Sequence, residues 1–277
     1  MTRQLVFTNA QGESYAFHNI LKINGLDSVS SKDVSAASSG QDGATYAGTY
    51  LGTRDMEISF DILADSPKQM AEAKRSLGNR LSPKMGAGSL LHSFCGMETE
   101  ISCVPQGLQF SKINTRWCTV LARFKAYDPY FSDTTDTIVP LTFVRHMLIF
   151  PVTFPAIFGA YINRETICNA GDAPAPVRIR FHGLVVNPSF RNLTTGETIR
   201  VAGTVAEDEI LEINTAFGIK SVTIIKNGAR ENAFSRLDPD SSLWQLPCGD
   251  SIIEYTADKE DMGGHGEIIY RNQYITI

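Results

Sequence analysis

The stretch RWCTVLARFKAYDPYFSD, from Arg116 to Asp133, decides the fold class of the first half of the chain. Its alternate apolar residues share one face, and they are Cys118, Val120, Ala122, Phe124 and Ala126. Alternation with a period of two predicts a half-buried β-strand. The strand should end at Asp128-Pro129, because proline lacks an N–H and disfavours helical geometry in the residue before it. Asp128 can then accept hydrogen bonds from local backbone groups as the chain turns.

Further β signals lie on the N-terminal side of this stretch. SYAFHNILKI (Ser14–Ile23) and RDMEISFDIL (Arg54–Leu63) carry clustered or alternating apolar residues between Gly, Asn and Asp, which is typical of strands. Between them, the small and polar segment SVSSKDVSAASSGQDG (Ser28–Gly43) predicts a flexible loop or the tip of a long hairpin. The first half is therefore expected to be a β domain.

One segment of the first half has helical rather than strand spacing. In SPKQMAEAKRSLGNRL, Ser66 fits an N-cap, Pro67 the first helical position and Gln69 the third position of a capping box. The apolar residues then recur on one stripe at helical spacing, at Met70, Ala73, Leu77 and Leu81. We expect a helix near residues 66–81 that lies on a sheet.

The second half shows short strands separated by turns, from Val177 to Ile277, as in an antiparallel sandwich. Asn227-Gly228 predicts a hairpin, since a type I′ turn needs positive φ at both central residues, and Thr195-Gly196 predicts a second one. The expected fold class is mainly β with two domains. An N-terminal β-sandwich-like domain with one α-helix (1–133) precedes an antiparallel β-sandwich (134–277) that begins with an apolar connector at about 138–162.

The connector carries more apolar surface than a monomer ordinarily exposes. Its four aromatic residues are Phe143, Phe150, Phe154 and Phe158. Each buries roughly 150–250 Å² when covered, so together they would bury about 600–1,000 Å², against about 300–600 Å² for the largest patch of an ordinary monomer. The segment must pack on its own domains or on a neighbouring subunit. A plain strand of the second sandwich is the alternative, and the two readings are compatible.

Tyr130 and Phe131 stand where the first domain passes into the connector. We expect Tyr130 and Phe131 to hold the first domain and the connector together. The stretch would then be a domain joint as well as the end of a strand. The interface or domain-joint candidates are Tyr130, Phe131, Phe143, Phe150, Phe154 and Phe158.

Composition excludes several functional classes. The 277 residues carry a formal net charge of −5, so no basic excess indicates a nucleic-acid or anionic-membrane binder. The N-terminus has no apolar run long enough for a signal peptide. The most apolar segment, Leu141–Tyr161, contains Arg145, His146 and two prolines, so it is not expected to span or insert into a membrane.

No motif of known chemistry is present: GxSxG, HExxH, P-loop, GxGxxG after a strand and the DxDxDG calcium loop are all missing. The five histidines lack the local spacing of a metal site. The five cysteines suggest small buried hydrophobes in a reducing compartment, and they are Cys95, Cys103, Cys118, Cys168 and Cys248. We expect no catalytic residue, no cofactor and no metal, although two carboxylates brought together from distant strands would leave no local motif.

The order of these elements resembles a known family. The series includes Asp128-Pro129-Tyr130-Phe131, Asn169-Ala170-Gly171, Pro176, Gly183, Asn187-Pro188, Asn192, Thr195-Gly196 and Tyr270-Arg271-Asn272. Over nearly the whole chain this series is similar to the distal tail protein (Dit) family of long-tailed, non-contractile bacteriophages. No single motif in it is specific; the resemblance rests on their order.

The resemblance implies a structural virion protein at the tail tip, assembled in the host cytoplasm. Family members form a hexameric ring of N-terminal domains, with galectin-like or carbohydrate-module-like sandwiches projecting outward. The implied partners are other copies of the chain, the tail tube protein, the tail-tip hub and, in many phages, a receptor-binding protein. DNA would pass through the ring without specific binding, which suits a chain with no basic excess.

A different class of function is a carbohydrate-binding β-sandwich that attaches to the host cell wall. Such sites present aromatic platforms, for which Trp244 with Tyr255 or Tyr270 are the candidates. The alternative for these three residues is a place in the core or at an interface. The chain has no insertion long enough to be an added carbohydrate-binding module of the kind that some family members carry.

Overall fold

The structure is a computed structural model that describes residues 3–37, 40, 42–111, 114, 116–141, 164–260 and 265–277. The chain forms two compact units, Met1–Thr134 with Tyr274–Ile277, and Thr135–Gln273. The expected second domain ran to residue 277, whereas the last four residues lie with the first unit. The first unit is thus built from two segments that are far apart in the sequence.

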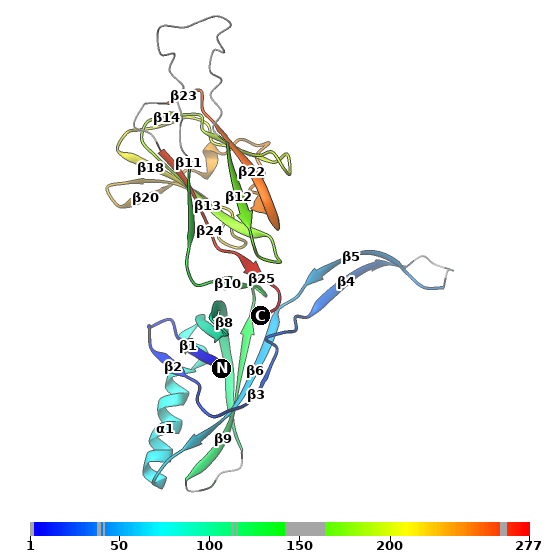
Figure 1. Ribbon diagram of the computed structural model, residues 1–277, viewed down its shortest axis with the longest axis vertical. Coiled ribbons are helices and arrows are strands. Elements are labelled where there is room, and N and C mark those ends of the chain that lie inside the picture. The colour runs from blue at the N-terminus through cyan, green and yellow to red at the C-terminus, as the bar shows by residue number, and fades with distance from the viewer. Residues whose placement is uncertain are drawn as a thin grey trace, which may run out of the picture. The chain divides into compact units, whose positions relative to one another are not determined.

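The first unit is built on an antiparallel sheet with the strand order β2-β1-β7-β8-β9-β6-β3 (Figure 1). Its strands are β1 (Gln4–Thr8), β2 (Ser14–Ala16), β3 (Ile20–Asn24), β6 (Arg54–Leu63), β7 (Gly88–Phe94), β8 (Met97–Ser111) and β9 (Trp117–Ala126). The short strand β10 (Phe131–Asp133) pairs with β8, and β25 (Gln273–Tyr274) lies at the boundary of the two units. Strands β2 and β3 are the two ends of the main order.

The strand predicted in the opening stretch is β9, with the predicted face inward. Its buried residues are Cys118, Val120, Ala122, Phe124 and Ala126. It ends at Ala126, just before Asp128-Pro129, as the proline predicts. The segment Ser14–Ile23 is β, as its apolar residues predict, and it contributes to two strands, because Asn19 has a positive φ of 50° and breaks the extended backbone between them.

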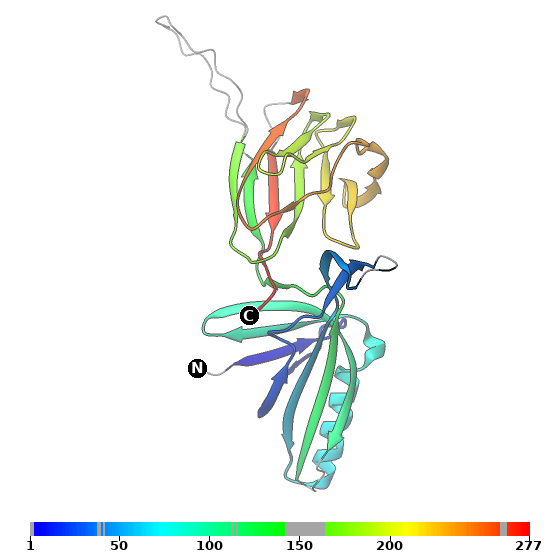
Figure 2. The ribbon, with the colours of Figure 1, turned by 90° about the vertical axis from the view of Figure 1, so that its right-hand side faces the viewer.

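Helix α1 (Pro67–Arg80) confirms the predicted helix, and Figure 2 shows it alongside the long strands of the sheet. The Ser66 side chain accepts the Gln69 N–H at 3.3 Å, as an N-cap should. The capping box is not reciprocal, since Gln69 Oε1 accepts the N–H of Asp65 at 3.0 Å rather than that of Ser66. Met70 and Leu77 face the core, and the short 3₁₀-helix η1 (Pro83–Met85) follows.

Strands β4 (Ser31–Ala36) and β5 (Thr45–Leu51) form a separate two-stranded sheet that runs out from the first unit (Figure 1). We call residues 31–51 the arm. Of the two expectations for Ser28–Gly43, the long hairpin is therefore the one that the described residues show. Every described residue of the two strands is exposed except Gly48 and Leu51, which are half-buried.

The second unit is a sandwich of antiparallel sheets. The larger has the order β11-β24-β13-β18-β19-β20 with β21 on β13, the next has the order β12-β22-β15-β16, and a small sheet has the order β17-β14-β23. The strands are β11 (Thr137–Leu141), β12 (Arg164–Asn169), β13 (Ala175–His182), β14 (Val185–Val186), β15 (Ser189–Asn192), β16 (Thr198–Arg200), β17 (Thr204–Val205), β18 (Glu209–Asn214), β19 (Ser221–Lys226), β20 (Ala229–Asn232), β21 (Gln245–Leu246), β22 (Gly249–Thr256), β23 (Lys259–Glu260) and β24 (His265–Tyr270), with the 3₁₀-helix η2 (Phe234–Arg236).

Both predicted hairpins are present in the second unit. Asn227 and Gly228 have φ of 50° and 79° and join β19 to β20, as the type I′ turn requires. Thr195-Gly196 lies in the turn between β15 and β16. With one α-helix in the described residues and antiparallel sheets in both units, the predicted mainly β, two-domain fold class is confirmed.

Candidate assembly interface

The two described joint candidates differ in burial. Phe131, on β10, is fully buried in the core of the first unit. Tyr130 is half-buried, and its N–H donates to Asp128 Oδ1 at 3.3 Å, which is the local bond expected of Asp128 after the strand ends. Burial and the neighbouring Asp128 raise the pKa of the Tyr130 phenol above its ordinary value. Phe131 is thus a core residue at the place where the chain leaves the first unit.

The Phe131 ring lies against a buried arginine that the sequence reasoning missed. The Arg54 guanidinium carbon is 4.9 Å from the ring centroid, within the range of a cation–π contact. The side chain makes five hydrogen bonds, all to backbone carbonyls, at Gly25, Leu26, Ser28, Pro129 and Ile275. Burial lowers the Arg54 pKa, and nearby Asp27 opposes that shift.

These carbonyls belong to three segments that are distant in sequence. Gly25 to Ser28 lead into the arm, Pro129 precedes β10, and Ile275 lies in the returning C-terminal segment. Arg54 itself follows the arm at the start of β6. The Arg54 side chain therefore binds three segments at once: the one that leads into the arm, the one that leaves the first unit before β10, and the C-terminal one that comes back to it.

Phe143, Phe150, Phe154 and Phe158 lie outside the described residues. The beginning of the expected connector is a strand, because Thr137–Leu141 forms β11 and pairs with β24 in the second unit. Leu141 is buried there, whereas Ile138 is exposed. The start of the segment therefore matches the alternative reading, a strand of the second sandwich.

The arm presents large side chains to solvent on both faces. Lys32 pairs with Tyr50, and Val34 pairs with Gly48, so Val34 and Tyr50 share one face. On the other face, Thr49 donates to Asp33 Oδ1 at 2.6 Å and shares a 2.7 Å hydrogen bond with the Tyr46 hydroxyl. A β-bulge after Val34 shifts the register of the two strands, so Tyr46 and Tyr50 lie on opposite faces of the arm.

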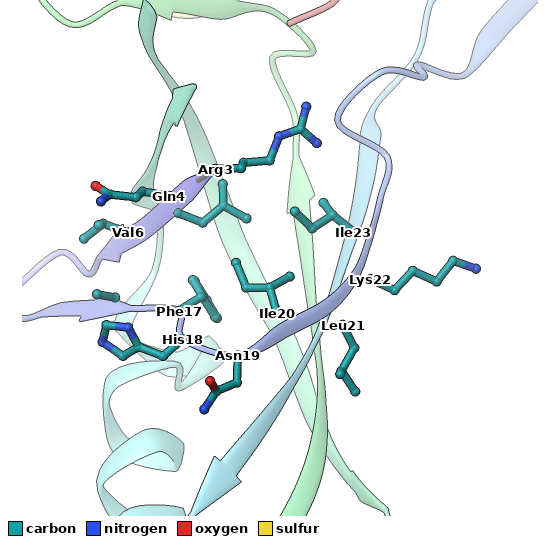
Figure 3. Close-up of a pocket in the computed structure, with 12 residues that line it drawn as sticks. Arg3, Gln4, Val6, Phe17, His18, Asn19, Ile20, Leu21, Lys22 and Ile23 are labelled. Carbon is teal, nitrogen blue, oxygen red and sulfur yellow. The ribbon is translucent and has the colours of Figure 1, made fainter. Parts of the chain in front are cut away.

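A hollow of about 800 Å³ lies between β1 and β3 (Figure 3). It is lined by Arg3 to Val6 on one side and by Ala16 to Ile23 on the other. Figure 3 shows Ile20 and Ile23 on the side of β3 that faces β1, Leu21 and Lys22 on its other side, and Arg3 at the start of β1. We call this hollow the β1–β3 groove. The residues that line it carry cationic side chains and no carboxylate.

The aromatic residues considered for a carbohydrate platform are buried inside the second unit. Trp244 is 2% exposed, Tyr255 1% and Tyr270 6%. Tyr255 on β22 stacks on Phe181 of β13 with ring centroids 5.4 Å apart, which places it between the two sheets. The Trp244 indole N–H donates to the Phe190 carbonyl at 3.3 Å. These three residues belong to the core of the second unit, which was the alternative expected for them, so they cannot serve as a platform for a sugar.

The acidic, histidine and cysteine side chains of the described residues form no metal-binding cluster, since no group of three or more of them could hold a metal ion. The five cysteines are free; Cys103 and Cys118 are buried as expected, whereas Cys95, Cys168 and Cys248 are exposed, so the expectation of burial was wrong for these three. Burial raises the pKa of the Cys103 thiol to about 12, which keeps it protonated and inert.

A partly buried ion network lies on the larger sheet of the second unit. Glu212 on β18 accepts hydrogen bonds from Arg180 at 2.7 Å and from Arg230 at 2.8 Å. Burial raises the Glu212 pKa, but the two guanidinium groups outweigh this and hold the pKa below its ordinary value. A carboxylate that is ionised and paired in this way is structural rather than a proton donor.

Two family models match the chain in sequence order. "Phage tail protein RIFT-related domain" matches residues 11–124, and "Siphovirus-type tail component, C-terminal domain" matches residues 170–274. Compared with curated protein sequences, the chain has no significant match. In the part of the chain that the structure describes, no helix is both long and apolar enough to cross a membrane.

Solved structures share the fold. SPP1 Dit, described as a paradigm of the hub adsorption apparatus in phages infecting Gram-positive bacteria, superposes with a TM-score of 0.71 at 12% identity over 99% of each chain. A chain of the phage P2 baseplate in its activated conformation with Ca superposes with a TM-score of 0.56 at 13% identity over 100% of each chain. A chain of the same baseplate with Sr superposes with a TM-score of 0.55 at 13% identity over 100% of each chain.

Proposed function

The chain belongs to the distal tail (Dit) family of siphovirus tail components, and from that membership we propose that six copies form a closed ring at the end of the tail tube. A structural protein of the distal tail or baseplate is what the family establishes. The hexamer and its neighbours are our proposal. In it, the first unit builds the ring and the second unit projects from it.

The observation that carries the proposal is the pair of family matches, one in each unit and in the order of the chain. Each unit therefore matches a domain of tail proteins, which supports a place for this chain in the tail. The arm of the first unit adds support. It is a long exposed hairpin that carries large side chains, and exposed apolar surface of this kind marks interaction sites.

The ring would join the tail tube protein to the tail-tip hub and offer a platform to a receptor-binding protein. DNA would pass through it without specific binding, which the net charge of −5 favours, since each neutralised phosphate would add salt-dependent affinity. The proposed place of action is the virion tail tip, after assembly in the host cytoplasm. Catalysis is no part of this role.

Electron microscopy of the purified protein and of tail particles tests the proposal. We expect a ring with six-fold symmetry in one or both samples. A monomer in dilute solution is compatible with assembly on partners, because association depends on protomer concentration. A monomer at high concentration, together with tails that lack a ring of this protein, would refute the proposal.

A further inference from the structure

We propose that the arm of one copy lies in the β1–β3 groove of the next copy and pairs with the free edge of β3. This inference rests on the proposed ring and names the contact that closes it. It commits to a second copy of the chain as the occupant of the groove. Four features of the described residues support it: the isolation of the arm, its two-faced surface, the open edge and the charge of the groove.

The arm needs a cover that its own unit does not provide. Among the described residues, no arm side chain belongs to the hydrophobic core of the first unit. An isolated two-stranded hairpin is marginally stable in water. The arm is nevertheless closed at its root, where Gly52 N–H donates to the Ser30 carbonyl at 2.7 Å and Ser30 Oγ donates to the Thr53 carbonyl at 2.6 Å. It is thus a defined element whose apolar surface is not covered within its own unit.

Both faces of the arm carry contact residues. Tyr50 is 68% exposed and Val34 45%, on one face, and Tyr46 is 66% exposed on the other. Tyrosines combine a large apolar ring with a hydroxyl and are enriched at protein interfaces. A ribbon with such residues on both faces is suited to lie between two walls, as in a groove, rather than on a flat surface.

The groove offers a strand edge of matching length. Strand β3 ends the strand order of the described sheet, with β6 on one side and the groove on the other. Edge strands carry backbone donors and acceptors that pair readily with an added strand. β3 spans Ile20–Asn24 and β5 spans Thr45–Leu51, so one arm strand can cover the whole edge. Leu21, 59% exposed on β3, supplies an apolar contact.

Charge favours the arm as the occupant. The groove presents Arg3 and Lys22 without a lining carboxylate. The arm carries Asp33 on the face of Tyr46 and Lys32 on the face of Tyr50, and Asp42 follows in the segment between its strands. The face with Asp33 is therefore the one whose charge suits the groove. Opposite charges fix register and reject wrong partners. Arm and groove are different surfaces of one chain, so the contact is head-to-tail, the type that generates a ring when its rotation closes.

Two complementary variants test the contact in trans. The first replaces residues 31–51 by a short glycine-containing turn and keeps the groove. The second is Leu21→Asp, which keeps the arm and places on β3 a charge that the proposed contact would bury. Leu63→Asp is the matched control, because Leu63 is 66% exposed on β6 of the same unit and does not line the groove. Sedimentation velocity and mass photometry of the full chain, each variant and their mixture give the masses.

We expect the full chain and the Leu63→Asp control to self-associate to the same extent. Each complementary variant alone should be a monomer, and their equimolar mixture should form dimers and nothing larger, since only one arm and one groove remain. Self-association of the arm-less variant, or a mixture that stays monomeric, would overturn the inference, as would a full chain that is monomeric at its highest soluble concentration. If the arm-less variant still forms rings in electron micrographs, the arm contact is wrong and the proposed ring stands. If tails contain no ring of this protein, the proposed ring itself is refuted.

Discussion

The arm and the Arg54 site are adjacent in the chain and opposite in character. The arm runs from Ser31 to Leu51 almost fully exposed, and Arg54, three residues beyond it, is 0% exposed. Arg54 binds carbonyls on the segment that enters the arm and on the two segments that connect the first unit to the second. The chain thus places an almost fully exposed element three residues from a fully buried arginine.

The difference separates folding from assembly. A buried cation without acceptors costs free energy, so Arg54 is stable only when all of its carbonyl partners are in place. The hydrogen bonds of Arg54 therefore depend on complete folding of the first unit, including its C-terminal segment. No arm residue that the structure describes belongs to that core, so the arm is available for contact with another molecule. Changes at the Arg54 site should therefore alter the free energy of unfolding, whereas changes in the arm should alter association between copies.

The largest expected effect is that of Arg54→Met. The change leaves five backbone carbonyls, one in a buried hydrogen bond and four in partly buried ones, without their donor. Hydrogen bonds to a charged group are each worth about 1.5–3 kcal/mol, though not additively. We expect the free energy of unfolding to fall by about 4 kcal/mol. Urea denaturation followed by intrinsic fluorescence measures this loss.

Arg123→Met is the control for Arg54→Met. Arg123 forms an exposed ion pair with Glu57 at 2.9 Å, and its side chain is 53% exposed. Surface pairs contribute about 0–1 kcal/mol, so this variant should lose little. If the two variants unfold at the same urea concentration, Arg54 does not hold the first unit together in the way described.

The next effect is that of Phe131→Ala, which should destabilise by about 3 kcal/mol, because it empties a fully buried site beneath Arg54. Tyr130→Ala should cost less, since Tyr130 is only half-buried. The domain-joint hypothesis adds that the double change impairs ring assembly. Electron microscopy of the double variant, under conditions in which both units remain folded, decides this point; normal rings would reject the joint.

Local patterns predicted local structure well in this chain. The alternation before Asp128-Pro129, the Ser66 cap and the Asn227-Gly228 turn were each correct, because each depends on a few consecutive residues. Arg54 gave no such signal. Its acceptors are backbone carbonyls, which carry no residue type, and they come from segments up to 221 positions away. Only tertiary structure brings them together.

The candidate interface was predicted less completely than the fold. The sequence indicated a long hairpin as one of two possibilities for Ser28–Gly43, but small polar residues say nothing about which surface they contact. The β1–β3 groove was missed, because an open edge depends on which strands fail to pair. The aromatic connector was recognised by composition, and its role stays a prediction, since those residues lie outside the described ranges.

A smaller, pH-dependent effect is expected of Glu212→Gln in the second unit. Unlike Arg54, Glu212 has charged partners, and its pKa is held below the ordinary value of 4.5. The ionised carboxylate therefore contributes stability above pH 4.5, and this contribution is lost as the pH falls through the lower folded-state pKa. At neutral pH we expect a loss of about 1–2 kcal/mol, since Arg180 and Arg230 are partly solvated.

Denaturation curves at several pH values check this prediction. The difference in unfolding free energy between the two proteins should shrink as the pH falls below 4.5. Glu57→Gln, in the exposed pair with Arg123, is the control and should show a smaller difference throughout. A constant difference at every pH would mean that packing, rather than charge, accounts for the contribution of Glu212.

The smallest effect on stability is expected from removal of the arm. With residues 31–51 replaced by a short turn, the unfolding free energy of the monomer should change by less than about 0.5 kcal/mol, as for surface changes that touch no core. The physical reason is that the root is closed by Ser30 and Gly52 and that no described arm residue packs in the core. Urea denaturation at a concentration where the full chain is monomeric makes the measurement. A loss comparable to that of Arg54→Met would show that the arm is part of the folded unit, and the separation between folding and assembly drawn from these two regions would fail.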